Sequence, residues 1–90
     1  MRSVTTNKFR KALEKLPVQT QIKARQAYRQ WKDNPYHPSL DFKKIHAKEE
    51  TIYAVRVGIG YRAIGVLKED TMIWFWIGSH EEYNKLINTL

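Results

Sequence analysis

The sequence predicts one α+β domain over residues 1–90: an N-terminal helical hairpin packed on a twisted antiparallel meander of four strands, then a short helix. Apolar residues recur at helical spacing as far as Asn34, and beyond residue 41 the spacing changes to the period of two that is typical of strands. A chain of 90 residues has the length of a single domain, and a hydrophobic share of 42% is enough for a folded core.

The first third of the chain is expected to form two helices. Residues 3–8 predict a short extra strand or an extended lead-in, and a polar residue among 5–7 can cap the helix that follows. Helices are predicted over 7–16 and 18–33, separated by Pro17, and an antiparallel hairpin is expected from this short connection. Their apolar positions are Phe9, Ala12, Leu13, Leu16, Ile22, Ala24, Ala27, Tyr28 and Trp31.

After an irregular connector at 35–41, four strands are predicted to pair in chain order. They are expected at 42–46, 51–57, 61–67 and 71–77, with a glycine turn at 58–60. The last strand is apolar throughout, which predicts burial on both faces in the centre of the sheet. We expect Trp74 and Trp76 on one side of this strand, in the core against the helices, and Phe75 and Ile77 on the other.

A final helix is expected over residues 80–88, with Tyr83, Leu86 and Ile87 facing inward. Ser79 and Glu82 match the capping box S-x-x-E, in which each side chain accepts a hydrogen bond from the other residue's backbone N–H. This motif predicts that the helix begins at His80.

Composition excludes several classes of protein. There is no cysteine, which excludes disulfides, thiolate metal sites and a cysteine nucleophile. The longest apolar run, at 72–78, is far shorter than the ~20 residues of a membrane span. No apolar segment stands near the N-terminus, so we expect no secretory signal and a cytoplasmic location. Three histidines without inward carboxylates do not predict a metal site.

The chain is strongly basic, and Lys43, Lys44, Arg56 and Arg62 lie on the predicted strands. Sixteen Lys and Arg residues against nine Asp and Glu give a net charge of +7, which favours a polyanionic partner. Arg56 stands before the glycine turn and Arg62 after it, so antiparallel pairing places them close together. Two neighbouring arginines require an anion between them. That anion is either a carboxylate, for which a glutamate of the last helix is the expected source, or a phosphate of a ligand.

His80 is the candidate for proton transfer. It opens a helix, whose N-terminus carries partial positive charge, so we expect a neutral imidazole that can accept a proton. Tyr83 lies three residues further on the same helical face. The alternative interpretation is that His80 is an exposed first-turn residue and Tyr83 a core aromatic. In the connector, Tyr36 and His37 are expected to be exposed.

Four stretches are familiar in this order: NPYHPSL at 34–40, KKI at 43–45, YAVRVGIGYR at 53–62 and IGSHEEY at 77–83. Together they resemble the RelE/ParE superfamily of bacterial type II toxins, and the sequence GSH at 78–80 resembles the YafQ-type branch. The resemblance implies a small basic α+β toxin that a cognate antitoxin wraps and neutralises. RelE-like members are endoribonucleases that cut mRNA on the ribosome without a metal or cofactor, whereas ParE-like members inhibit DNA gyrase.

The resemblance also implies roles for single residues. In RelE-like nucleases the residue at the position of Arg62 contacts the scissile phosphate, and Arg56 corresponds to a basic residue on the preceding strand. His80 corresponds to the position after the last strand. Tyr83 corresponds to an aromatic residue near the base. Lys43, Lys44, Lys48 and His37 are then the candidate contacts to flanking RNA. The expected function is a metal-independent mRNA endoribonuclease, with a gyrase-inhibiting or catalytically inactive toxin-fold protein as the alternative.

Overall fold

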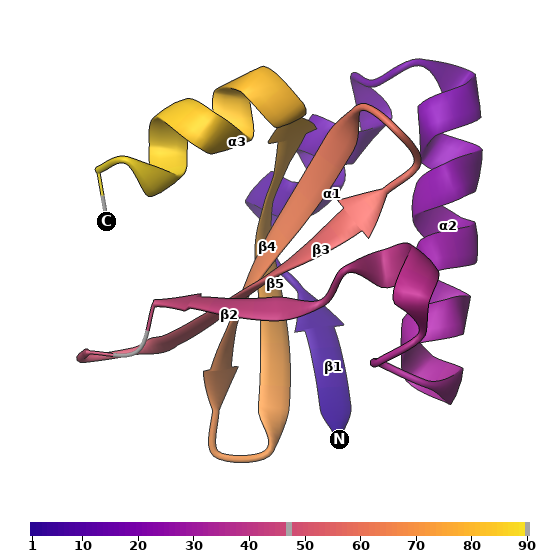
Figure 1. The fold of residues 1–90 in the computed structure, drawn as a ribbon. Coiled ribbons are helices and arrows are strands. Elements are labelled where there is room, and N and C mark those ends of the chain that lie inside the picture. The colour runs from indigo at the N-terminus through magenta and orange to yellow at the C-terminus, as the bar shows by residue number, and fades with distance from the viewer. Residues whose placement is uncertain (47, 90) are drawn as a thin grey trace.

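A five-stranded sheet forms the centre of the molecule (Figure 1). The computed structural model describes residues 1–46 and 48–89. The strands lie in the order β1-β5-β4-β3-β2. Their bounds are Arg2–Thr5 for β1, Lys43–His46 for β2, Thr51–Val57 for β3, Tyr61–Lys68 for β4 and Thr71–Ser79 for β5. The antiparallel meander of β2 to β5 is confirmed, and the N-terminal lead-in is a fifth strand that pairs in parallel with β5.

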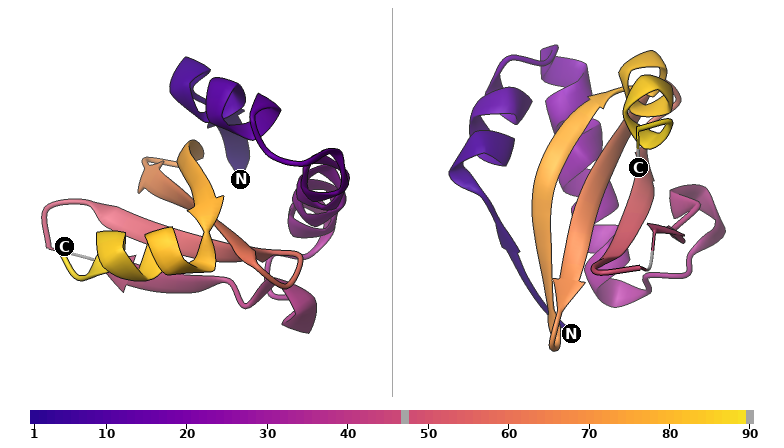
Figure 2. Two further views of the ribbon diagram at one scale, coloured as in Figure 1. Left: turned by 90° about the horizontal axis from the view of Figure 1, so that it is seen from above. Right: turned by 90° about the vertical axis from the view of Figure 1, so that its left-hand side faces the viewer.

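Helices cover both faces of this sheet. They are α1 (Asn7–Glu14), α2 (Val18–Asp33) and α3 (His80–Ile87). The left panel of Figure 2 views α2 end-on while α1 lies across the view, and the two helices cover different strands of one face: α1 packs over β5, and α2 over β3. The two predicted helices are therefore present, but the antiparallel hairpin expected from their short connection is wrong, because each helix packs on the sheet. The opposite face carries α3. None of the helices in the described part of the chain is long and apolar enough to cross a lipid bilayer.

Aromatic rings fill the core beneath α1 and α2. Trp31 of α2 is 2% exposed and meets Trp74 of β5 edge to face, with ring centres 5.3 Å apart. Phe42, just before β2, packs on Trp31 at 6.0 Å and on Tyr53 at 4.7 Å. This packing holds the end of the connector against the sheet, and it thereby fixes the position of the preceding residue, Asp41.

β5 contains a bulge that changes the direction of its side chains. Ile64 of β4 pairs with Trp76 and Gly65 with Trp74, so Phe75 is the extra residue. Trp74 therefore packs in the core beneath α1 and α2, whereas Phe75 and Trp76 both belong to the cluster on the face of α3. The prediction that both tryptophans face the N-terminal helices is correct for Trp74 and wrong for Trp76, because the bulge interrupts the alternation. For the same reason the opposite side is correct for Phe75 and wrong for Ile77, which packs with Trp74.

Candidate functional site

Two arginines face each other across the hairpin of β3 and β4. Arg56 lies directly opposite Arg62 in the register, as predicted. Both share a face with Ala54 and Ile64, which pack in the cluster beneath α3, because alternate residues of a strand point to the same side. Arg56 is exposed, but Arg62 is only 7% exposed. Like charges in opposite positions repel, so this pair depends on a neighbouring anion.

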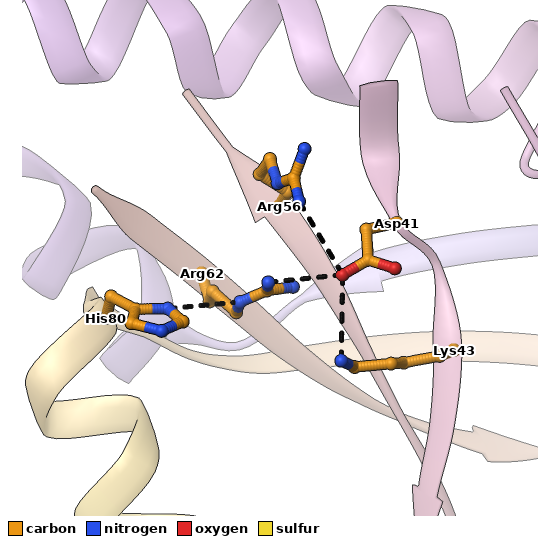
Figure 3. Close-up of polar contacts among 5 residues, drawn as sticks. All are labelled: Asp41, Lys43, Arg56, Arg62 and His80. Atoms are coloured by element: carbon orange, nitrogen blue, oxygen red, sulfur yellow. Dashed lines mark hydrogen bonds and ion pairs between the residues drawn. The ribbon is translucent and has the colours of Figure 1, made fainter. Parts of the chain in front are cut away.

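That anion is the carboxylate of Asp41 (Figure 3). Its Oδ2 atom accepts a hydrogen bond from Nη2 of Arg62 at 3.1 Å, and lies 3.6 Å from Nζ of Lys43 and 3.9 Å from Nη2 of Arg56. The expected carboxylate from the last helix is wrong, because Glu82 is engaged in the cap of α3 while the connector brings Asp41 over the sheet. We call Asp41, Lys43, Arg56, Arg62 and His80 the cationic cluster.

The connector after α2 positions Asp41. Residues Pro38–Leu40 form a turn of 3-10 helix, and Asp41 follows with φ of 45°, a left-handed conformation that Asp adopts more readily than most residues. Burial acts to raise the pKa of Asp41, but the hydrogen bond from Arg62 and the charges of Lys43 and Arg56 outweigh it. The pKa of this carboxyl therefore lies below its usual range, and Asp41 is ionised at neutral pH.

His80 is the first residue of α3 and lies beside Arg62. Its backbone N–H donates to the carbonyl of Gly60 at 2.8 Å, which ties the start of the helix to the β3–β4 turn. Nε of Arg62 donates to Nδ1 of His80 at 3.4 Å. The capping box of Ser79 and Glu82 is confirmed, with backbone-to-side-chain hydrogen bonds of 2.9 and 3.1 Å. The exposed imidazole is thus held against the guanidinium.

Tyr83 packs beneath the cluster from the next turn of α3. It is 3% exposed, and its ring centre lies 5.2 Å from Cζ of Arg62 and 6.1 Å from the ring of His80. The hydroxyl is buried and has no hydrogen-bond partner among the described residues. Burial raises the pKa of Tyr83 although the charge of Arg62 opposes this, so the phenol is neutral at physiological pH. Tyr83 is both a core aromatic and a contact of Arg62.

The remaining predicted contacts lie in different places. Lys43 belongs to the cluster, whereas Lys44 pairs with Tyr53 and lies on the face of α1 and α2. Lys48 is in the exposed bend between β2 and β3. Nδ1 of His37 accepts a hydrogen bond from the Ser39 backbone at 3.2 Å and caps the 3-10 turn. Within residues 1–46 and 48–89, no three His, Asp or Glu side chains are grouped so as to hold a metal ion.

The cluster carries more positive charge than Asp41 neutralises. Three cations surround one carboxylate, whose side chain is 38% exposed and so is open to solvent. Nη1 of Arg62 is buried and has no hydrogen-bond partner in the described chain. A buried N–H without an acceptor is unfavourable, and a guanidinium is suited to two parallel contacts with a phosphate. The excess of positive charge therefore favours binding of an anionic ligand at the cluster, with an imidazole beside it.

Asp41 is the site residue that the sequence analysis does not identify. The available local signal is an aspartate directly after a proline-rich connector and two residues before Lys43. Its contact with Arg62, 21 positions later, depends on the pairing of three strands and has no local signature. The glutamate at the start of α3 that the sequence offers instead, Glu82, is engaged in the cap of that helix.

Comparisons with known proteins agree with this fold. The sequence profile of the ParE-like toxin domain matches residues 18–85. A search of curated proteins found no match. Among solved structures, the chain is similar to the archaeal RelE–RelB complex from Pyrococcus horikoshii OT3, with a TM-score of 0.70, 18% identity, and coverage of 87% of this chain and 92% of that one.

Two further structures show the same likeness. The RelB–RelE antitoxin–toxin complex from Methanococcus jannaschii gives a TM-score of 0.70, 20% identity, and coverage of 92% of this chain and 96% of that one. The isolated E. coli RelE toxin gives a TM-score of 0.64 and 13% identity, with coverage of 98% of this chain and 96% of that one. At these identities the structures show the fold, while the profile match spans α2 to α3 and every residue of the cationic cluster. The chain therefore belongs to the family of ParE-like toxin domains, and it shares its fold with RelE toxins.

Proposed function

We propose that this protein is the toxin of a type II toxin–antitoxin system and that it acts as a metal-independent endoribonuclease that cleaves mRNA. The observation that carries the proposal is the state of Arg62: a buried guanidinium held between Asp41 and His80, with Nη1 unpaired in the described chain. This arrangement supports binding of a phosphate next to a group that transfers protons at neutral pH.

The nucleophile of the proposed reaction comes from the RNA itself, and two proton transfers accompany its attack. The ribose 2′-OH attacks the adjacent phosphorus, its proton passes to a base, the bond to the 5′-oxygen breaks, and that oxygen takes up a proton. The products are a 2′,3′-cyclic phosphate and a 5′-OH. His80 performs one of the two proton transfers. Arg62 and Arg56 stabilise the charge that develops on the phosphoryl oxygens, and removing one such stabiliser typically lowers the rate by ~10²–10³.

Room for the flanking nucleotides adjoins Arg56. A groove of about 310 Å³ between α2 and the connector has Arg56 at one side and Gln26, Gln30 and Ser39 along it. Lys43, and beyond the cluster Lys44 and Lys48, supply the remaining positive charge for flanking or ribosomal RNA. Such contacts to the phosphate backbone give affinity without sequence preference.

A cognate antitoxin is the proposed protein partner. The archaeal RelE chains similar to this one were solved in complexes with RelB. We propose that an antitoxin binds this toxin in the same way and that the free toxin acts in the cytoplasm on mRNA bound to ribosomes.

The test is to express the wild type, His80→Ala and Lys8→Ala, and to map the 5′ ends of cellular mRNA. Lys8 is exposed on α1 and is the matched control for loss of one side chain. We expect new mRNA ends at ribosome-phased positions for the wild type and Lys8→Ala, and none for His80→Ala. Thermal unfolding of each purified variant checks that it is folded.

One alternative is favoured by the match to the ParE-like profile. A gyrase inhibitor would cause a DNA-damage response, no new mRNA ends, and equal toxicity of wild type and His80→Ala. That result would reject the nuclease. A toxin-fold protein that only binds RNA would show salt-dependent affinity without toxicity.

A further inference from the structure

All three cations of the cluster converge on one oxygen atom. Lys43, Arg56 and Arg62 belong to β2, β3 and β4, which are neighbours in the sheet, and each approaches Oδ2 of Asp41 within 3.9 Å. A phosphoryl oxygen is the ligand atom that such a triangle of donors is suited to bind. Oδ2 of Asp41 thus lies at the point where a bound phosphate would place an oxygen.

We propose that Asp41 is a positioning residue that holds the place of the substrate phosphate: it aims the three cations at one point in the free protein and is displaced from that point when the phosphate binds. The inference rests on the proposed function for the identity of the ligand as RNA. The exchange of one anion for another rests only on the geometry of the cluster.

The two sides of this ion pair differ in how firmly they are held. All three cations stand on strands, but only Arg62 is also held at its side chain, which is 8% exposed and is fixed by the ring of Tyr83 and by His80. The side chains of Lys43 and Arg56 are 49% and 45% exposed. Asp41 comes from a connector, directly after a single 3-10 turn, and its side chain is 38% exposed. The carboxylate is therefore the partner that can turn away while Arg62 stays in place.

Charge explains why an exchange is needed. A phosphodiester and Asp41 each carry one negative charge, and both cannot occupy the point between the three cations because like charges repel at this distance. The phosphate offers two non-bridging oxygens, so it can divide its contacts among the three cations, whereas Asp41 meets all three through the single atom Oδ2. The exchange thus favours phosphate over a carboxylate ligand, at the cost of the hydrogen bond between Arg62 and Asp41.

This cost predicts that neutralising Asp41 tightens binding. The probe is a 2′-O-methyl RNA hexamer, which cannot be cleaved because it lacks the nucleophile. We expect Asp41→Asn to lower its dissociation constant about tenfold at fixed salt, since a hydrogen bond between charged groups no longer has to be broken. Asn also tolerates the left-handed backbone at this position. Asp33→Asn removes the same charge at the end of α2 and is expected to change the constant by about twofold or less.

A purely structural role for Asp41 predicts the opposite. If Asp41 only held Arg62 in place, Asp41→Asn would bind the hexamer as weakly as the wild type or more weakly, and this would overturn the inference. If Asp41→Asn does not fold, Asp41→Gly removes the carboxylate while keeping the backbone preference.

In the wild type itself, titration with inorganic phosphate is expected to shift the NMR signals of the Asp41 carboxyl carbon and Arg62 Nε on one binding curve. A shift of Arg62 alone would also overturn the inference.

The experiment separates this inference from the nuclease proposal. Cleavage of unmodified RNA by the wild type is measured in parallel. Absence of cleavage together with tighter binding by Asp41→Asn rejects the nuclease and retains the exchange of anions. Cleavage by the wild type without tighter binding by Asp41→Asn retains the nuclease and rejects the role of Asp41.

Discussion

The hydroxyl of Tyr83 is the subject of the sharpest stability prediction. It is buried and has no hydrogen-bond partner in the described chain, while the ring is 3% exposed and packs on Arg62. An unsatisfied buried polar group destabilises a fold by about 1–3 kcal/mol. Tyr83→Phe removes that group and keeps the ring, so we expect the free energy of unfolding to rise by up to about 1–3 kcal/mol. For a domain of this size, 1 kcal/mol corresponds to about 4–8 °C in Tm.

The assay is urea unfolding followed by tryptophan fluorescence, with Tyr83→Leu as the control. Leucine loses the aromatic contact with Arg62 and leaves unfilled volume, so we expect a loss of about 1–3 kcal/mol. If Tyr83→Phe were destabilised by more than about 1 kcal/mol, the hydroxyl would have a partner and the reasoning would be refuted. RNA cleavage gives a second reading: a stable Tyr83→Phe protein that no longer cleaves would assign the hydroxyl to the reaction.

Two further predictions concern the rest of the fold. The cap of α3 lowers the pKa of Glu82 through hydrogen bonds from Ser79, so its stabilisation is complete above the ordinary glutamate pKa of about 4.3 and is lost as the pH falls through the lower folded value. Glu82→Gln keeps a capping side chain that does not ionise. We therefore expect its urea midpoint to fall less than that of the wild type as the pH is lowered from 6 to 2. A Cβ at Gly65 would lie 2.8 Å from buried atoms of Met72 and Trp74, so Gly65→Ala is expected to lower the free energy of unfolding by about 1–3 kcal/mol. Gly60→Ala meets nothing within 4 Å and is the matched control; an equal loss in both variants would contradict the packing argument.

Local patterns were sufficient for most of the elements. The second helix is observed at its predicted bounds, 18–33, because prolines stand near both ends. The capping box located the start of α3 at His80, and the turn at 58–60 placed Arg56 opposite Arg62. Each of these signals acts within a few residues. They also account for the part of the candidate site that the sequence predicts.

Features that depend on distant pairing could not be predicted in this way. The bulge at Phe75 follows from the register with β4, and nothing in the apolar run at 71–77 marks the extra residue. Strand β5 continues to Ser79 because its last residues pair with Tyr61 and Arg62. Asp41 meets the arginines only after the connector is packed over the sheet by Phe42. Tertiary packing thus decides the direction of side chains that local spacing leaves open.

The parallel pairing of β1 with β5 has a consequence for the order of folding. Arg2 lies opposite Thr71, so this contact closes a loop that contains most of the chain, whereas β3, β4 and β5 pair with their neighbours in sequence. Closing a long loop costs more chain entropy than forming a hairpin. During synthesis the hairpins can assemble as they emerge, while the N-terminal strand has to wait for its partner. Until it docks, β5 presents unpaired backbone groups at the rim of the sheet, which is the state most exposed to association with other chains.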